Sequence, residues 1–150
     1  MSLKQKLQSD LNDAIKSRNT VVAETIRMIL SAITNEEVAG KEKKELSEAE
    51  VITVLTREAK KRREAAEAFE TGGRADRAAA ERAEGEVIAS YLPEQLTESE
   101  INNLISETIA AVGATGPSDM GKVMGALKAK VAGKADGALV SSLVKAALNK

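Results

Sequence analysis

The residues best suited to chemistry in this sequence are glycines and lysines gathered in its last quarter. Gly121 and Gly125 stand inside residues 118–140, SDMGKVMGALKAKVAGKADGALV, whose apolar spacing predicts a helix. A glycine inside a helix costs about 1 kcal/mol relative to alanine. Glycine also removes side-chain bulk and lysine neutralises phosphate, so the combination suits a surface that receives a nucleic-acid backbone. The candidate residues for contact with such a phosphate backbone are Gly121, Lys122, Gly125, Lys128, Lys130, Gly133 and Lys134.

Helical geometry separates these residues from the predicted core. At about 100° per residue, one arc of the helix about 100° wide holds the apolar side chains, which are Met120, Val123, Met124, Leu127 and Val131. Gly121 and Gly125 fall next to each other outside this arc, with Lys128 beside them. Either a neighbouring helix approaches closely over the glycines or a phosphate backbone does, and the sequence favours neither.

Seven helices are expected to position these residues, because apolar residues recur at helical spacing and no segment alternates with period two. Three capping boxes mark helix starts, at Ser2 with Gln5, Ser47 with Glu50, and Thr97 with Glu100. Ser118 and Asp136 are the predicted caps of the last two helices. The first four helices are expected near residues 2–17, from 20 to about 38, from 47 to 71, and 75–91, and the fifth ends at Gly113.

The predicted fold is all-α, with a four-helix N-terminal domain and a small three-helix tail domain. Pro93, within LPEQLTESE, interrupts the helical pattern because a proline disfavours helical geometry in the residue before it. The expected domains are residues 1–93 and 94–150. Only one Phe and one Tyr occur in the 150 residues, so the cores must be built from aliphatic side chains.

The composition argues against most catalytic classes. The chain contains no Cys and no His, which removes the usual thiolate nucleophile, general base and metal ligands. No cofactor, no metal and no catalytic residue are therefore expected. The chain shows no apolar run of membrane-spanning length and no signal-peptide pattern, so a cytoplasmic protein is the expectation.

The charge is unevenly distributed along the chain. The formal net charge is −1, yet residues 115–150 carry six lysines against two aspartates, Asp119 and Asp136. The basic run at residues 60–64, KKRRE, spreads around its helix and is expected to be solvated and ion-paired, with the stem of Arg62 packed. Neighbouring carboxylates such as Glu36 and Glu37 are expected to lie on wet helix faces without catalytic work.

Six phrases resemble the YqeY family: RMI at 27–29, NEE at 35–37, EAKKRREAAEAF at 58–69, GGRAD at 72–76, YLPEQL at 91–96 and DMGKVMGALKAKVAGKADGALV at 119–140. They occur in order along nearly the whole chain. The last phrase is also similar to the tail domain of the B subunit of the glutamyl/aspartyl-tRNA amidotransferase. That tail commonly has proline where Gly137 stands here.

The resemblance implies two helical domains and an association with tRNA. In the amidotransferase this tail packs against the outer corner of the tRNA, and the chemistry occurs in other domains. The shared positions here are Gly121, Lys122, Met124, Leu127, Gly133, Lys134, Ala135 and Asp136. The family label, a carbon–nitrogen ligase with glutamine as amido-N-donor, is interpreted as inherited from the complete enzyme.

Two alternatives to a weak tRNA-binding protein stay open at this point. The partners implied by the resemblance are tRNA and a protein of tRNA charging or of the amidotransferase. In the first alternative, the predicted third and fourth helices dock another protein, and the tail only stabilises the fold. In the other, the chain takes part in glutamine-dependent amidation. A partner that survives ribonuclease treatment would favour the first alternative, and release of ammonia from glutamine by the purified protein would favour the second.

Overall fold

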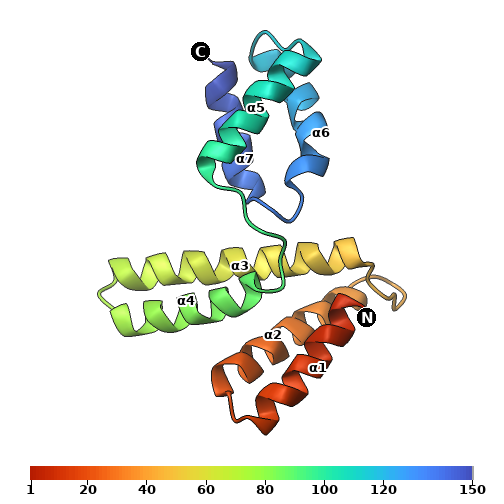
Figure 1. Ribbon diagram of the computed structural model, residues 1–150, viewed down its shortest axis with the longest axis vertical. Coiled ribbons are helices and arrows are strands. Elements are labelled where there is room, and N and C mark those ends of the chain that lie inside the picture. Colours follow the sequence, from red (N-terminus) through yellow and green to blue (C-terminus); the bar gives the residue numbers. More distant parts are fainter. Residues whose placement is uncertain (150) are drawn as a thin grey trace. The chain divides into compact units, whose positions relative to one another are not determined.

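The protein is helical throughout the part of the chain that the structure describes, residues 1–149 (Figure 1). In this range the computed structural model has seven α-helices, one short 3-10 helix and no strand, which confirms the expected all-α fold class. None of these helices combines the length and the apolar character needed to cross a bilayer. Contacts divide the chain into two compact units, Met1–Leu92 and Pro93–Lys150. They are called the first and the second unit below.

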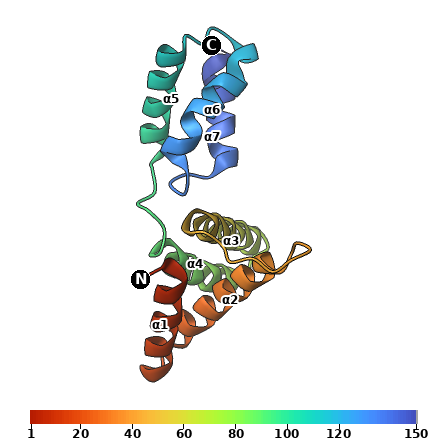
Figure 2. The ribbon, with the colours of Figure 1, turned by 90° about the vertical axis from the view of Figure 1, so that its right-hand side faces the viewer.

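The first unit consists of two helical hairpins. Its helices are α1 (Leu3–Lys16), α2 (Thr20–Glu37), α3 (Glu48–Thr71) and α4 (Ala75–Ala89). Helix α1 lies alongside α2, and α3 lies alongside α4 (Figures 1 and 2). The predicted capping boxes are present at α1 and α3, where the hydroxyls of Ser2 and Ser47 accept hydrogen bonds from the backbone N–H groups of Gln5 and Glu50. Local sequence therefore sets where these two helices begin.

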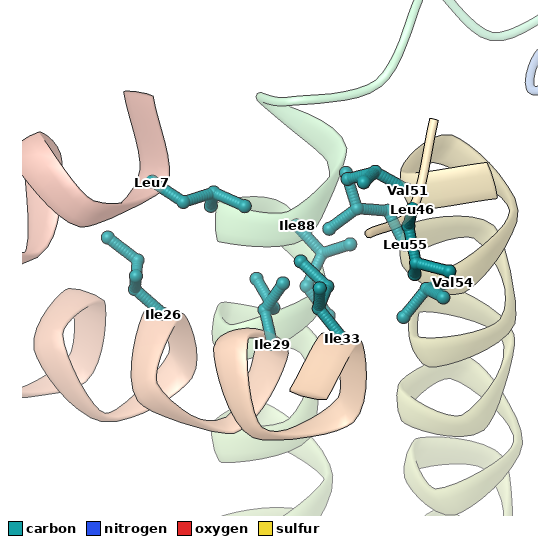
Figure 3. Close-up of a cluster of buried hydrophobic side chains, with 9 residues drawn as sticks. All are labelled: Leu7, Ile26, Ile29, Ile33, Leu46, Val51, Val54, Leu55 and Ile88. Carbon is teal, nitrogen blue, oxygen red and sulfur yellow. The ribbon is translucent and has the colours of Figure 1, made fainter. Parts of the chain in front are cut away.

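Aliphatic side chains from all four helices meet in the core of the first unit (Figure 3). Its nine buried residues are Leu7, Ile26, Ile29, Ile33, Leu46, Val51, Val54, Leu55 and Ile88. Burying one such side chain stabilises the fold by about 1.5–3 kcal/mol. Tyr91 packs only at the edge of this cluster, where its hydroxyl donates a hydrogen bond to Asp10 at 2.6 Å. The core is thus aliphatic, as the scarcity of aromatic residues requires.

A buried glutamate fixes the loop that joins the two hairpins. Glu37 is 4% exposed, and its carboxylate accepts hydrogen bonds from Lys4 Nζ at 2.8 Å and from the backbone N–H of Leu46 at 3.3 Å. Its backbone carbonyl accepts another from the N–H of Lys44 at 3.0 Å. The hydrogen bond from Lys4 holds the pKa of Glu37 below its ordinary value. Glu37 therefore ties the loop at Lys44 and Leu46 to Lys4 of α1.

Charged pairs hold α3 against α4. The side chain of Arg62 is 20% exposed, and its guanidinium lies 3.2 Å from Glu84 and 3.5 Å from Glu81. Arg82 lies 2.6 Å from Glu70 across the same hairpin. The prediction that the stem of Arg62 packs is confirmed, and its guanidinium meets carboxylates. Charge on this hairpin is thus largely matched by charge of opposite sign.

The second unit is a short helical bundle. It contains α5 (Glu98–Val112), the 3-10 helix η1 (Pro117–Asp119), α6 (Met120–Val131) and α7 (Gly137–Leu148). The capping box of Thr97 and Glu100 starts α5, and Gly113 ends it with a left-handed φ of 68°. Asp136 caps α7 by accepting a hydrogen bond from the N–H of Ala138. Gly137 is the first residue of α7, a position that proline also suits, so the departure from the amidotransferase pattern leaves the helix start in place.

The second unit has a core of its own. Eight residues are buried in it, namely Ile101, Ile105, Val123, Leu127, Val131, Val140, Val144 and Leu148. They come from α5, α6 and α7, and none of them belongs to the core of the first unit. Each unit therefore buries its own apolar side chains.

Two predicted helix boundaries are wrong. Ser118 does not cap α6, because it lies inside η1, where Pro117 has already brought the chain into helical geometry. The N-cap of α6 is Asp119, whose carboxylate accepts from the N–H of Thr115 at 2.8 Å instead of capping its own helix. The fourth helix stops at Ala89, two residues before the predicted end at Tyr91.

Candidate nucleic-acid interface

The buried face of α6 determines what the helix presents to solvent. Val123, Leu127 and Val131 are buried, and Met120 and Met124 pack against them at the edge of the core. These residues form the apolar arc expected from the sequence. The opposite side of α6 is exposed and carries glycine, alanine and lysine only.

The two helical glycines lie on this exposed face with nothing over them. A Cβ atom added to Gly121 or to Gly125 would meet no other atom within 4 Å, apart from adjacent backbone of its own helix. Neither has a positive φ, so neither is needed for backbone geometry. Within the described residues of the second unit, no neighbouring helix therefore approaches the two glycines, so the first of the two explanations left open by the sequence has no support from the packing of this unit. We call Gly121 and Gly125 the glycine strip.

Alanines widen the bare surface around the glycine strip. Ala129 and Ala132 fall on the same side of the helix at about 100° per residue, and both are exposed. Between Lys122 and Lys128, which flank this side, no exposed side chain is larger than a methyl group. Sequence reasoning had identified the glycines but not these alanines.

The lysines are not equivalent in their relation to the strip. With Met120 at 0°, the strip is centred at about 120°, Lys128 lies at about 80° and Lys122 at about 200°. Lys130 lies at about 280°, which is about 160° from the strip. All three lysines are exposed. None of them forms a salt bridge within 4 Å to a carboxylate in the described part of the chain. Lys128 and Lys122 are therefore the cations best placed to act together with the glycines.

Asp119 is the acidic residue nearest to this face along the chain, and its charge is already engaged. The hydrogen bond from the backbone N–H of Thr115 is the main cause that holds the pKa of Asp119 below its ordinary value, and the positive charge of Lys122 contributes. Helix α6 itself contains no acidic residue, whereas α5 contains Glu98, Glu100 and Glu107 and no basic one. The second unit thus has a basic helix and an acidic helix.

The turn between α6 and α7 holds the remaining two candidate residues, Gly133 and Lys134. Gly133 has a left-handed φ of 72° and its carbonyl accepts a hydrogen bond from Gln95 Nε2 at 2.8 Å. The carbonyl of Lys134 accepts from the backbone N–H of Leu96 at 2.8 Å. The segment before α5 therefore fixes this turn. Gln95 and Leu96 carried no signal that sequence reasoning could have used, since they lie 38 residues from their partners.

Glu36 and Glu37 were expected to lie on wet helix faces, and for Glu37 this expectation is wrong, because the residue is only 4% exposed. Glu37 holds the loop between the hairpins, as described above, and Glu84 binds Arg62. Glu48 accepts a hydrogen bond from the N–H of Leu3, and Glu50 takes part in the capping box of α3. Each of these four carboxylates therefore has a partner within the first unit.

We expect the replacement of Gly125 by alanine to stabilise the second unit. The methyl group enters open space, and alanine is favoured over glycine in a helix interior by about 1 kcal/mol. In a unit of this size that gain raises the unfolding temperature by about 4–8 °C, which thermal unfolding followed by circular dichroism measures.

Gly133→Ala is the matched control for this prediction. The same methyl group is added there to a residue with a φ of 72°, so stability should fall by about 1 kcal/mol. A loss of stability in Gly125→Ala would show that something packs on the glycine strip.

A comparison with protein-family models matches nearly the whole chain. The family model described as Yqey-like protein matches residues 4–148, which covers both units almost completely. The chain belongs to the YqeY family. The resemblance of the six sequence phrases is thereby confirmed, and it extends over α1 to α7.

Two curated fungal proteins are similar to this YqeY-family chain. An uncharacterized protein of Schizosaccharomyces pombe is 34% identical over 94 residues, which cover 62% of this chain and 74% of that protein. A Pyrenophora tritici-repentis protein named altered inheritance of mitochondria protein 41, mitochondrial, is 29% identical over 133 residues, 87% of this chain and 71% of that protein. Neither name states a molecular activity.

Proposed function

We propose that the protein binds tRNA through the exposed face of α6 and acts as an accessory protein in tRNA charging. The observation that carries the proposal is the uncovered glycine strip between Lys122 and Lys128. Gly121 and Gly125 destabilise the helix, and within the second unit neither packing nor backbone geometry requires a glycine at these positions. A phosphate backbone that approaches the helix would use both the missing side chains and the flanking ammonium groups.

The choice of tRNA among nucleic acids rests on residues 119–140. This segment resembles the tail of the amidotransferase B subunit, which contacts tRNA, and the resemblance includes Gly121, Lys122, Gly133 and Lys134. The second unit contains no aromatic residue on which single-stranded bases could stack, so the shape and charge of the RNA backbone would dominate recognition. The location that we propose for the protein is the cytoplasm, where tRNA is charged.

The proposal is for a binding protein without catalysis of its own. The overall charge of −1 gives little general attraction to RNA, so we expect weak binding that a protein of the charging or amidation machinery would reinforce. Docking through α3 and α4 receives less support, because Arg62 and Arg82 are already paired with carboxylates across that hairpin.

A titration of bulk tRNA at several salt concentrations tests the proposal. If Lys122, Lys128 and Lys134 each meet a phosphate, the logarithm of the association constant should fall against the logarithm of salt concentration with a slope of about 2–3. Fluorescence anisotropy of labelled tRNA gives this slope directly. Absence of binding at low salt, or a slope near zero, would contradict the proposed function.

A further inference from the structure

The second unit contains a hollow that the glycine strip does not explain. Its volume is about 440 Å³, and it lies between the start of α6 and the C-terminal half of α7. Its lining residues are Pro117, Met120, Ser141, Lys145, Leu148 and Asn149. Pockets for small molecules commonly measure roughly 300–1,000 Å³, so the hollow is large enough for one.

The lining of the hollow combines two kinds of chemistry. Pro117, Met120 and Leu148 give apolar walls, and the methionine thioether makes favourable contacts with aromatic rings. Ser141 and Lys145 on α7 and its C-cap residue Asn149 follow one another at intervals of four residues, so they form one polar ridge. A hydroxyl, an ammonium and an amide on that ridge suit a planar ring with hydrogen-bonding edges that carries a phosphate.

The hollow and the glycine strip begin at the same end of α6. Met120, which lines the hollow, directly precedes Gly121 in the chain. The Cα atoms of these two consecutive residues are about 3.8 Å apart, so an RNA strand that contacts Gly121 lies beside a residue that lines the hollow. The second unit has no aromatic side chain to stack on a base, so an apolar hollow at this place would supply the contact that aromatic side chains supply elsewhere.

We propose that this hollow receives one unpaired nucleobase of the bound RNA. This inference rests on the proposed function and makes its ligand more specific. The base lies between Pro117, Met120 and Leu148, the amide of Asn149 meets its hydrogen-bonding edge, and Lys145 neutralises a neighbouring phosphate. The hollow has room for the ring of a base and does not read a nucleotide sequence. It therefore favours RNA that can expose an unpaired base over RNA that is fully paired.

Methionine methyl groups give a direct test on the complete protein. The chain has four methionines, and among the lining residues of the hollow only Met120 is a methionine. With ¹³C-methyl methionine, addition of adenosine monophosphate should move the Met120 methyl signal upfield, because the ring current of the base acts on it. The signals of Met28, in the first unit, and Met124, on the core side of α6, should stay in place.

Ribose 5-phosphate is the matched probe without a base. It should leave the Met120 signal unchanged. An equal response to both probes would show that the hollow binds phosphate only, and no response to millimolar adenosine monophosphate would show that it does not take a base. Either result overturns the inference.

A pair of serine variants extends the test to tRNA. Ser141 lines the hollow, whereas the next residue, Ser142, is exposed and does not. Ser141→Leu should fill the hollow, abolish the Met120 response and weaken tRNA binding about tenfold, and the salt slope should fall by no more than about 1, the share of the Lys145 contact. Ser142→Leu should change none of these, and equal effects of the two variants would overturn the inference.

The outcomes separate this inference from the proposed function. A Met120 response to adenosine monophosphate, together with tRNA binding that shows no salt dependence, would contradict the lysine face and leave the hollow standing. Salt-dependent tRNA binding without a Met120 response would contradict the hollow alone.

Discussion

Leu127→Ala is expected to unfold the second unit and to leave the first unit folded. Leu127 is fully buried at the centre of α6, among side chains from α5 and α7. Truncation of a buried leucine to alanine costs about 2–5 kcal/mol, because transfer free energy is lost and a cavity remains. A unit of fewer than 60 residues buries too little surface to have much stability in reserve.

Two optical signals distinguish the units in this experiment. The only tyrosine, Tyr91, belongs to the first unit, so its fluorescence reports on that unit alone. Far-ultraviolet circular dichroism reports on helices of both units. In Leu127→Ala we expect a loss of helical signal at room temperature and an unchanged tyrosine transition on heating.

Leu139→Ala is the matched control for Leu127→Ala. Leu139 lies on α7 in the same unit but is 38% exposed, so the same truncation should cost well under half as much. A shift of the tyrosine transition in Leu127→Ala would mean that the two cores unfold together, which the separate membership of the cores argues against.

Helix starts could be predicted well from the sequence because caps act over three or four residues. All three capping boxes form, and Asp136 caps α7 as expected. Ser118 was the exception, because the residue before it, Pro117, starts a 3-10 turn that carries the chain past Ser118 before α6 begins. The residues around Ser118 do start a helical element, but this element is η1 and not α6.

Contacts between distant segments could not be predicted in the same way. The hydrogen bond from Gln95 to the carbonyl of Gly133 and the ion pair of Arg62 with Glu84 depend on how helices pack. A helical pattern shows that Arg62 is near the core, but not which carboxylate it meets. Likewise, the pattern placed Gly121 and Gly125 outside the apolar arc without showing what covers them.

The candidate site therefore needed both kinds of information. The sequence identified the glycines, the lysines and the buried arc, and the structure showed that the strip is open. The hollow beside Met120 lay beyond sequence reasoning, because its walls come from η1 and α7, more than twenty residues apart along the chain. Residues that meet only through tertiary packing carry no shared periodicity.

Reversal of charge at Lys122 and Lys128 together should weaken tRNA binding about 50-fold near physiological salt. Each phosphate contact contributes about 0.7–0.9 to the salt slope, so at roughly 0.1 M salt the loss of one contact weakens binding about 5- to 8-fold. Both lysines flank the glycine strip, and two losses therefore multiply to this value. The slope itself should fall by about 1.4–1.8, which separates lost phosphate contacts from a partly unfolded protein.

Lys130→Glu is the control that makes this prediction specific to the strip. It makes the same change of charge on the same exposed helix, but about 160° away from the glycines. If the strip receives the RNA backbone, Lys130→Glu should weaken binding less than about threefold, through long-range electrostatics alone. Equal losses from Lys128→Glu and Lys130→Glu would mean that RNA responds to the total charge of α6, and the open glycines would then have no part in binding.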